Sequence, residues 1–321
     1  MKSVLSIYRT LPRYNSAQPS AVTIGNFDGV HLGHQTILER VRREAIQLNL
    51  SPSVVTFTPH PRVYFAQRGN RPELIPTQIS TLRDKLTLLA DHGMAQIVLA
   101  KFNQEFADME AEHFIQQLLV KGLNTKWLLV GEDFRFGHQR SGNIESLRNA
   151  GERYGFTVET VADIADEQGR RISSSELRTA LAVGNMTRSA ELLGRPYQLS
   201  GHVVHGKKLG RTLGYPTLNL PVPPLFAAKS GVYVVRAYGL GPGVLQGIAS
   251  LGVRPTVTES GTLLLEVHLL DSKVDAYGKL VKIELLDFVR EEEKFPDLQT
   301  MIAAIDNDVR CAREYFAAHG L

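Results

Sequence analysis

Two patterns of apolar residues divide the chain. Up to about Gly184, short apolar runs alternate with segments in which apolar residues recur every three or four positions. Short apolar runs are typical of buried strands, and apolar residues at every third or fourth position are typical of amphipathic helices. We therefore expect strands and helices to alternate. The expected strands are residues 21–24, 54–57, 96–99 and 127–130, and the expected helices are a segment starting at Gly33 and residues 80–92 and 111–122. This alternation predicts an α/β domain with a parallel sheet covered by helices on both faces.

After about Arg195 the pattern changes to short strands with connections rich in glycine and proline. The expected strands are residues 197–204, 231–238, 245–251, 263–270 and 281–288. Strands without intervening helices predict an antiparallel barrel or sandwich. A last helix, residues 296–318, carries an apolar stripe that begins at Leu298 and is expected to pack against the barrel. The change of pattern at residues 186–195 predicts two domains, 1–186 and 187–321.

The composition narrows the class of protein. The 321 residues carry a net charge of +3, which suits an anionic ligand but is too small to indicate nucleic-acid binding. The lone cysteine, Cys311, excludes a disulfide within the chain and a multi-cysteine metal site, and it favours a reducing cytoplasm. Residues 1–13 lack a signal-peptide pattern, and no apolar run approaches the roughly 18 residues of a membrane span. We therefore expect a cytoplasmic chain without nucleic-acid or membrane partners; these features do not determine the oligomeric state, for which a monomer is the expectation.

The first candidate site is the sequence GNFDGVHLGHQ, residues 25–35, between an expected strand and an expected helix. The free N–H groups and partial positive charge of a helix N-terminus suit a phosphate. His31 and His34 could donate to phosphate oxygens in a transition state. A zinc site is a weaker alternative, because the glutamate of the helical zinc motif is absent and no cysteine lies near. A turn filled by two histidines without chemistry is the remaining interpretation.

A second candidate segment is RISSSELR, residues 171–178. Ser173 and Glu176 have the spacing of a capping box, which is an ordinary helix start. The three serines and Arg178 could instead cradle an anion, with the guanidinium pairing bidentately with phosphate.

A third segment, GEDFRFGHQRSG at residues 131–142, follows an expected strand. Ligands of open α/β sheets bind at the carboxyl ends of the strands, so this loop is well placed for a ligand. Phe134 and Phe136 either flank a flat ring or fix the loop onto the core.

The second domain contains a stretch, residues 192–258, that has no Asp or Glu but several basic residues: Arg195, Lys207, Lys208, Arg211, Lys229, Arg236 and Arg254. It predicts either a solvated basic face or a site for a polyanion such as a nucleoside triphosphate. Within it, Gly206, Gly210 and Gly214 recur every four residues with cations between them. This spacing is typical of either a phosphate loop or a glycine-rich hairpin.

Three polar residues, two on a further presumed strand at residues 217–219 and one on the expected strand 263–270, suggest phosphoryl-transfer chemistry. Thr217 and Asn219 are two residues apart and share a face, where a hydroxyl and an amide oxygen could ligate Mg²⁺. Because the acid-free stretch has no carboxylate, a catalytic base must come from elsewhere. Glu266 interrupts an apolar strand and is either a solvent-facing side chain or a base that takes a proton from an attacking hydroxyl.

Four motifs in this order make the first part of the chain resemble the adenylyltransferase module of bacterial bifunctional riboflavin kinase/FAD synthetases, which are H-x-G-H nucleotidyltransferases: GNFDGVHLGHQ, TFTPHPR (residues 56–62), GEDFRFGHQRSG and ISSSELR. The resemblance implies a Rossmann-like sheet in which His31 and His34 bind the triphosphate while FMN phosphate attacks the α-phosphorus. The implied ATP-binding residues are Gly25, Asn26, Phe27, Asp28, His31, Gly33, His34, Ser173, Ser174, Ser175 and Arg178. Among these, Asn26 and Asp28 would orient adenosine or a metal. The implied FMN-binding residues are His60, Pro61, Arg62, Asp133, Phe134, Phe136 and Arg140.

The second part resembles the riboflavin kinase module in GHVVHGKKLGRTLGYPTLNL (residues 201–220), GVYVV, GVRPTV, LEVHLLD and FVREEEKF. The resemblance implies that Thr217 and Asn219 bind Mg²⁺ and ATP, and that Glu266 activates the 5′-hydroxyl of riboflavin. The implied ATP-binding residues are Gly206, Lys207, Gly210, Arg211, Gly214, Pro216, Thr217 and Asn219, and the implied riboflavin-binding residues are Glu266, Arg290 and Phe295. Leu218 stands where the family usually has alanine, and we expect it to point away from the ligands.

The resemblance covers nearly the whole chain. It implies that the barrel makes FMN from riboflavin and ATP, and that the α/β domain makes FAD and pyrophosphate from FMN and a second ATP. Two alternatives stay open: a nucleotidyltransferase with another acceptor, such as a cytidylyl or pantetheine-type substrate, and a barrel that binds flavin for regulation without catalysis. The Phe134 and Phe136 pair favours a flat aromatic acceptor, and the joint presence of Thr217, Asn219 and Glu266 favours catalysis.

Overall fold

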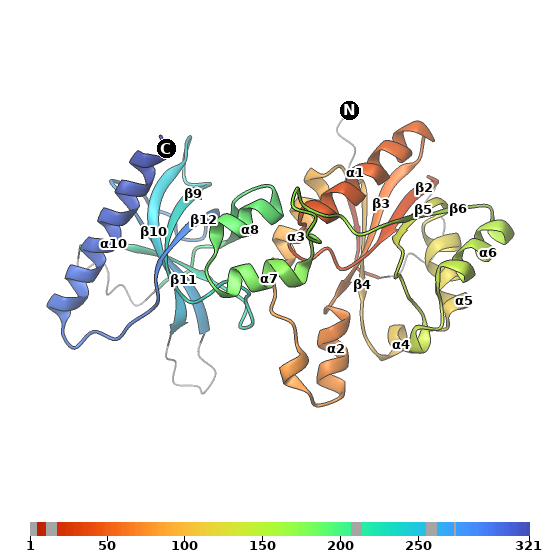
Figure 1. The fold of residues 1–321 in the computed structure, drawn as a ribbon, viewed down its shortest axis with the longest axis horizontal. Coiled ribbons are helices and arrows are strands. Elements are labelled where there is room, and N and C mark those ends of the chain that lie inside the picture. The colour runs from red at the N-terminus through yellow and green to blue at the C-terminus, as the bar shows by residue number, and fades with distance from the viewer. Residues whose placement is uncertain (1–4, 11–17, 207–213, 255–261, 273) are drawn as a thin grey trace. The chain divides into compact units, whose positions relative to one another are not determined.

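The computed structural model describes residues 5–10, 18–206, 214–254, 262–272 and 274–321. The chain forms two compact units (Figure 1). The first consists of residues up to Pro76 together with Lys85–Ile172, and the second of Thr77–Asp84 together with Ser173–Leu321. Among the described residues, no helix is long and apolar enough to cross a membrane.

The first unit is built on a six-stranded sheet of order β1-β4-β3-β2-β5-β6, in which every neighbouring pair is parallel. Its strands are β1 (Ser6–Tyr8), β2 (Ser20–Ile24), β3 (Ser51–Thr58), β4 (Gln96–Lys101), β5 (Thr125–Gly131) and β6 (Thr157–Val161). The chain runs from β2 to β3 and β4 on one side and then to β5 and β6 on the other. In such sheets the ligand crevice opens at the carboxyl ends of the strands that flank the reversal, which here are β2 and β5.

Helices cover both faces of this sheet, as the alternation of strands and helices predicts. On one face, α1 (Leu32–Gln47) and the part of α3 (Leu82–Asp91) from Lys85 onward pack against strand residues such as Ala21 and Trp127. On the other, α5 (Ala111–Phe114), η2 (Ile115–Gly122) and α6 (Ile144–Tyr154) pack against strand residues such as Val22 and Leu128. The expected helix 111–122 is thus one α-helical turn that continues as a π-helical segment. The remaining short helices are α2 (Pro61–Arg68), η1 (Pro72–Leu74), α4 (Gln104–Ala107) and η3 (His138–Arg140).

The second unit holds an antiparallel sheet of order β7-β12-β9-β10-β11-β8. Its elements are α7 (Ser174–Ala182), α8 (Met186–Leu193), β7 (Tyr197–His202), β8 (Thr217–Pro221), β9 (Gly231–Tyr238), β10 (Leu245–Arg254), β11 (Thr262–Leu269), β12 (Leu280–Arg290) and α10 (Leu298–Ala318). A bridge between Val204 and Asn219, with an N–O distance of 2.9 Å, joins the chain after β7 to β8 at the opposite edge. The sheet therefore curls into the half-closed barrel that the strand pattern predicts.

Helix α10 packs on the face formed by β9 and β10 (Figure 1). Ala312 and Phe316 are buried against Val234 and Ile248. The predicted stripe is confirmed in this part of the helix, whereas Leu298 at its start is 53% exposed. The side chain of Asp297 caps the helix by accepting from the Thr300 amide at 2.7 Å.

A short segment from the first half of the chain, Thr77–Asp84, is an integral part of the second unit. The backbone of Gln78 accepts from the Ala227 amide at 2.9 Å, and the Tyr197 hydroxyl donates to the Ile79 carbonyl at 2.6 Å. The Asp84 carboxylate accepts from the Ser200 amide at 3.1 Å, and Ile79 is fully buried. These contacts make the segment part of the packed interior of the second unit.

Candidate functional site

The turn between β2 and α1 has an unusual backbone. Phe27 and Val30 adopt left-handed conformations, with φ of 48° and 44°, and Gly29 has φ of 80°. This region is costly for residues with a side chain, above all for a β-branched residue such as Val30, and such strain persists where surrounding contacts hold it. The turn is held by three bonds: Gly25 N to Val55 O at 3.0 Å, Gln35 Nε2 to Val30 O at 2.9 Å, and Thr56 Oγ1 to Asn26 O at 2.9 Å.

The two histidines stack on each other, with ring centroids 3.7 Å apart and planes inclined by 19°. His31 caps α1, since its Nδ1 accepts from the His34 amide at 3.3 Å, and neutral His31 therefore carries its proton on Nε2. A Cβ on Gly33 would lie 3.2 Å from His31 Nδ1 and 3.4 Å from the Ile172 carbonyl oxygen. The glycine of the motif thus leaves the space that the stacked rings need.

Two polar side chains of this turn are enclosed. Asp28 is only 9% exposed. The Oδ1 atom of Asn26 is buried and has no hydrogen-bond partner among the described residues. A buried oxygen without a partner is costly unless a ligand or ion satisfies it, so Asn26 suits a ligand-binding position.

Lys85 reaches the same turn, although it belongs to none of the sequence motifs. Its Nζ lies 3.3 Å from the Asn26 carbonyl oxygen and 3.2 Å from Thr56 Oγ1. Burial lowers the pKa of Lys85 from 10.5 to about 8, against the charge of Asp28, which raises it. A signal was present in the sequence, because Lys85 precedes Leu88 and Leu89 by three and four residues and so lies on the core-facing stripe of its helix.

The segment predicted to bind FMN after β3 begins α2. His60 is the N-cap of this helix, and its Nδ1 accepts from the Arg62 amide at 3.1 Å. Pro61 occupies the first helical turn, where the lack of an N–H group costs nothing. Arg62 is exposed and lies beyond the carboxyl end of β3.

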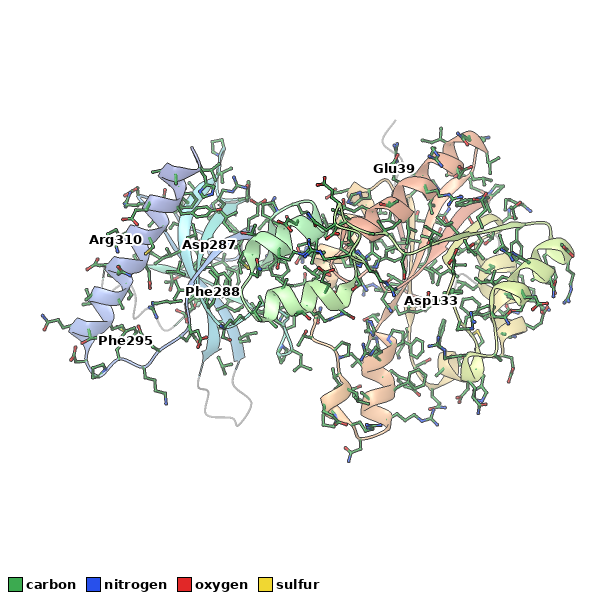
Figure 2. All side chains as sticks on the ribbon, viewed as in Figure 1. Glu39, Asp133, Asp287, Phe288, Phe295 and Arg310 are labelled. Carbon is green, nitrogen blue, oxygen red and sulfur yellow. The ribbon has the colours of Figure 1, made fainter. Side chains whose placement is uncertain are left out.

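The loop after β5 presents one face to solvent and one to the core. Asp133 and Arg140 are exposed residues, and Figure 2 labels Asp133. Phe136 is 7% exposed and packs on Phe114, with centroids 5.1 Å apart. Phe134 stacks directly on Phe136 at 5.6 Å and 18°. The two rings contact each other, so in this structure they fix the loop onto the core and do not enclose a ring between them.

The ISSSELR segment starts α7 and belongs to the second unit from Ser173 onward. The Ser173 side chain caps the helix by accepting from the Glu176 amide at 3.2 Å, while the Glu176 carboxylate pairs with Arg188 at 3.0 Å from Nε. Ser174 is partly buried and Ser175 is exposed. Nε of Arg178 donates to the Thr77 carbonyl oxygen at 2.7 Å. The use of these residues together with His31 and His34 stays a prediction.

The second unit places its three candidate residues on neighbouring strands. Asn219 of β8 is opposite Glu266 of β11, and Thr217 is opposite His268. Glu266 is in turn opposite Ser250 of β10. Side chains directly opposite each other in a sheet point to the same face, and so do residues two apart. Thr217, Asn219 and Glu266 therefore share one face of the sheet.

A cavity of about 570 Å³ opens beside β8. Its walls include Gly214, Pro216 and Thr217, which were predicted to bind ATP, and Tyr277 from a distant loop. Leu218 also lines this cavity, and its expected orientation away from the ligands stays a prediction. The Pro216 carbonyl oxygen lies 3.0 Å from His268 Nδ1, which fixes the start of β8 against β11.

Two of the predicted phosphate-loop glycines are described. A Cβ on Gly206 would lie 2.7 Å from Asn219 Oδ1, so the loop backbone closes directly over this amide, which is 4% exposed. Gly214 has φ of 89°, a conformation that favours glycine. Lys207, Gly210 and Arg211 lie outside the described residues.

Two of the three residues predicted to bind riboflavin, Arg290 and Phe295, lie at the end of β12 and beyond it, while Glu266 lies on β11. Arg290 makes two bonds of 2.8 Å to the carboxylate of Asp308 on α10, which is 2% exposed. The Phe295 ring lies 5.5 Å from the Arg290 guanidinium, in the connection between β12 and α10 (Figure 2). Arg290 therefore links the strand to the helix, whatever else it contacts.

Carboxylates from outside the acid-free stretch neutralise part of its charge. Arg236 pairs with Glu284 at 2.8 Å, and Lys229 pairs with Glu291 at 2.6 Å. These two cations thus belong to local ion pairs and not to an open basic face.

Two family models match the chain. The model described as FAD synthetase matches residues 14–176, and the model described as riboflavin kinase matches residues 193–316. The bifunctional riboflavin kinase/FMN adenylyltransferase of Escherichia coli K12 is 42% identical over 295 residues, covering 92% of each chain. The enzyme of the same name from Haemophilus influenzae is 40% identical over 300 residues, covering 93% of this chain and 95% of its own length. A crystal structure described as a macrolide-efflux protein from Streptococcus pneumoniae has a TM-score of 0.79 at 30% identity, covering 95% of this chain and 98% of its own.

Proposed function

The chain belongs to the family of bifunctional riboflavin kinase/FMN adenylyltransferases, and we propose that its two parts divide the two reactions between them. The chain phosphorylates riboflavin with ATP to FMN, and it adenylylates FMN with ATP to FAD, releasing pyrophosphate. Residues 1–186 would form the adenylyltransferase domain and residues 187–321 the kinase domain. The gap between the two family matches, residues 177–192, supports this division.

In the adenylyltransferase reaction, an oxygen of FMN phosphate attacks the α-phosphorus of ATP, and the bond to the bridging oxygen of pyrophosphate breaks. We assign His31 and His34 to the charge that develops on the α-phosphoryl oxygens. Their stacking at the start of α1 supports this role, because a helix N-terminus adds its own partial positive charge at the same place. Asn26 and Asp28 would orient adenosine or a metal ion.

The other residues of the adenylyltransferase domain would contact ATP and FMN. Gly25, Phe27 and Gly33 would shape the turn around ATP. The β- and γ-phosphates, which leave as pyrophosphate, would be held by Ser173, Ser174, Ser175 and Arg178. The proposed FMN-binding residues are His60, Pro61, Arg62, Asp133, Phe134, Phe136 and Arg140. Residues 60–62 follow β3 and residues 133–140 follow β5, which supports this assignment because ligands of such sheets bind beyond the carboxyl ends of the strands.

In the kinase reaction, the 5′-hydroxyl of riboflavin attacks the γ-phosphorus of ATP and ADP leaves. Glu266 would take the hydroxyl proton as the new bond forms. Its place on the same face as Thr217 and Asn219 supports this role. Gly206, Lys207, Gly210, Arg211, Gly214 and Pro216 would contact ATP, and Arg290 and Phe295 would contact riboflavin.

The oxygen donors at both sites fit Mg²⁺, a hard cation that prefers hydroxyl, amide and carboxylate oxygens. In the kinase domain Thr217 and Asn219 would hold the ion, with Glu266 opposite. In the adenylyltransferase domain the buried Asn26 Oδ1 atom and the Asp28 carboxylate offer suitable oxygens. When bound, Mg²⁺ neutralises phosphate charge; the protein's own part is to position the reacting groups.

The observation that carries the proposal is that each family match contains its own candidate site, one at the ends of β2 and β5 and one on β8 and β11. The lone cysteine supports work in a reducing cytoplasm, and a monomer with only small-molecule substrates remains the expectation. The test is to incubate the chain with riboflavin, ATP and Mg²⁺ and to separate the products by chromatography. Both FMN and FAD should form; absence of either product would refute the bifunctional assignment.

A further inference from the structure

The ammonium group of Lys85 joins two segments of the adenylyltransferase domain that are far apart in sequence. Its Nζ lies 3.3 Å from the Asn26 carbonyl oxygen, 3.2 Å from Thr56 Oγ1 and 3.3 Å from the Phe57 carbonyl oxygen. Asn26 belongs to the turn after β2, and Thr56 and Phe57 lie at the end of β3. Three acceptors match the three donors of an ammonium group, and hydrogen bonds from a charged donor are stronger than neutral ones.

The turn needs such a support. Phe27, Gly29 and Val30 all have positive φ, so the backbone leading to His31 is held in a conformation that it would not adopt alone. The Asn26 carbonyl oxygen, one residue before Phe27, accepts from both Lys85 and Thr56, and Thr56 is fully buried. Beyond Phe57, the same strand leads into His60 at the start of α2.

We propose that Lys85 is a positioning residue of the adenylyltransferase reaction, which ties the turn carrying His31 and His34 to the end of β3 that leads to the proposed FMN-binding residues. The inference rests on the proposed roles of the two histidines. Lys85 touches neither substrate in this account; it fixes the distance between the segment that binds the triphosphate and the segment that binds FMN. Loss of such a constraint affects the rate of the chemical step more than binding of either substrate, because a small displacement of reacting groups is costly.

The experiment compares Lys85→Met and Lys85→Arg with the unchanged chain. FAD formation from supplied FMN and ATP gives kcat and KM for each substrate, and FMN formation from riboflavin by the same preparation serves as an internal control. We expect Lys85→Met to lower kcat for FAD formation at least tenfold while both KM values change less than threefold. Lys85→Arg should recover most of the rate, because a guanidinium can donate to the same acceptors. The matched control is Lys126→Met, which removes an exposed lysine near the amino end of β5.

Unchanged kcat in Lys85→Met would overturn the inference, and so would a loss of kcat that Lys85→Arg does not relieve. If circular dichroism shows that Lys85→Met does not fold, Lys85→Gln, which keeps a shorter polar end group, decides by the same criteria. A His31→Ala, His34→Ala double variant separates the two levels of the account. If that variant retains FAD formation, the proposed function of the turn fails; if it loses FAD formation while Lys85→Met does not, only the inference on Lys85 fails.

Discussion

Asn219 of β8 lies directly opposite Glu266 of β11 in the antiparallel sheet of the second unit. The pairing places an amide and a carboxylate side by side, with Thr217 two residues away on the same face. A possible metal ligand and a possible proton acceptor thus lie on adjacent strands, although 46 positions of sequence separate them. Transfer of a phosphoryl group to a hydroxyl requires such groups to be positioned together.

Glu266→Gln should abolish FMN formation and spare FAD formation. The amide keeps the size of the side chain but cannot accept the hydroxyl proton, and loss of a general base typically costs 10²–10⁴ in rate. The measurement is FMN formation from riboflavin, with FAD formation from supplied FMN in the same preparation. Asp271→Asn is the matched control, because its carboxylate pairs with Arg313 on the surface after β11. FMN formation by Glu266→Gln within threefold of the unchanged chain would remove the base assignment.

Gly33→Ala should slow FAD formation at least tenfold and leave FMN formation unchanged. The added Cβ would lie 3.2 Å from His31 Nδ1 and 3.4 Å from the Ile172 carbonyl oxygen, so the stacked rings must shift. The control is Gly201→Ala, where the nearest atom to a Cβ is 3.7 Å away. If Gly33→Ala forms FAD at the normal rate, then the observed stacking of His31 and His34 is not needed for the reaction.

Much of this architecture follows from local patterns in the sequence. Strand β9 is predicted at its observed ends, because residues 231–238 are apolar except for Arg236 and Gly239 follows them. His31 and His34 are correctly expected before and within the first turn of a helix, since the apolar stripe of α1 fixes where the helix starts. The order of strands in either sheet could not be read in this way, because it depends on contacts between distant segments.

Asp308→Ala should destabilise the second unit by about 3 kcal/mol, because it leaves the Arg290 guanidinium without the buried carboxylate that binds it at two points. The hydrogen bond to Asp308 also raises the pKa of Arg290. The control on the same helix is Glu314→Ala, whose partner Arg310 and own side chain are both about 60% exposed, so its loss should cost less than about 1 kcal/mol. Denaturant unfolding followed by circular dichroism measures both values, and equal effects of the two variants would contradict the structural role of Asp308.

The stability of the first unit should depend on the protonation of Lys85. Burial lowers the pKa of Lys85 from 10.5 to about 8 in the folded chain. Between these values the unfolded chain binds more protons than the folded chain, so the free energy of unfolding rises with pH. Relative to Lys85→Met, the unchanged chain should gain on the order of 2 kcal/mol between pH 8 and 10.5, and the difference should be constant below pH 7. Unfolding at a series of pH values tests this; a difference that does not vary with pH would contradict burial of the charge.

Three features could not be predicted because they depend on tertiary contacts. The helical stripe indicates that Lys85 faces the core, but its acceptors lie on β3 and in the turn after β2, 29 and 59 residues away, and no local pattern identifies them. Segment Thr77–Asp84 packs in the second unit through hydrogen bonds to Leu225, Ala227 and Ser200. The composition of the segment does not predict these bonds. For Phe134 and Phe136, sequence allowed both packing and ligand contact, and only the burial of Phe136 shows that it packs in the core.

The division of the two reactions between two sites is tested most directly by mixing two full-length variants that each lack one of the two activities. The His31→Ala, His34→Ala double variant should convert riboflavin to FMN and stop there, and Glu266→Gln should make FAD from FMN but nothing from riboflavin. With riboflavin, ATP and Mg²⁺, the mixture of the two variants should form FAD, because FMN released by one is the substrate of the other. If the mixture makes no FAD although each variant performs its remaining reaction, or if either variant alone converts riboflavin to FAD, the division of labour is contradicted.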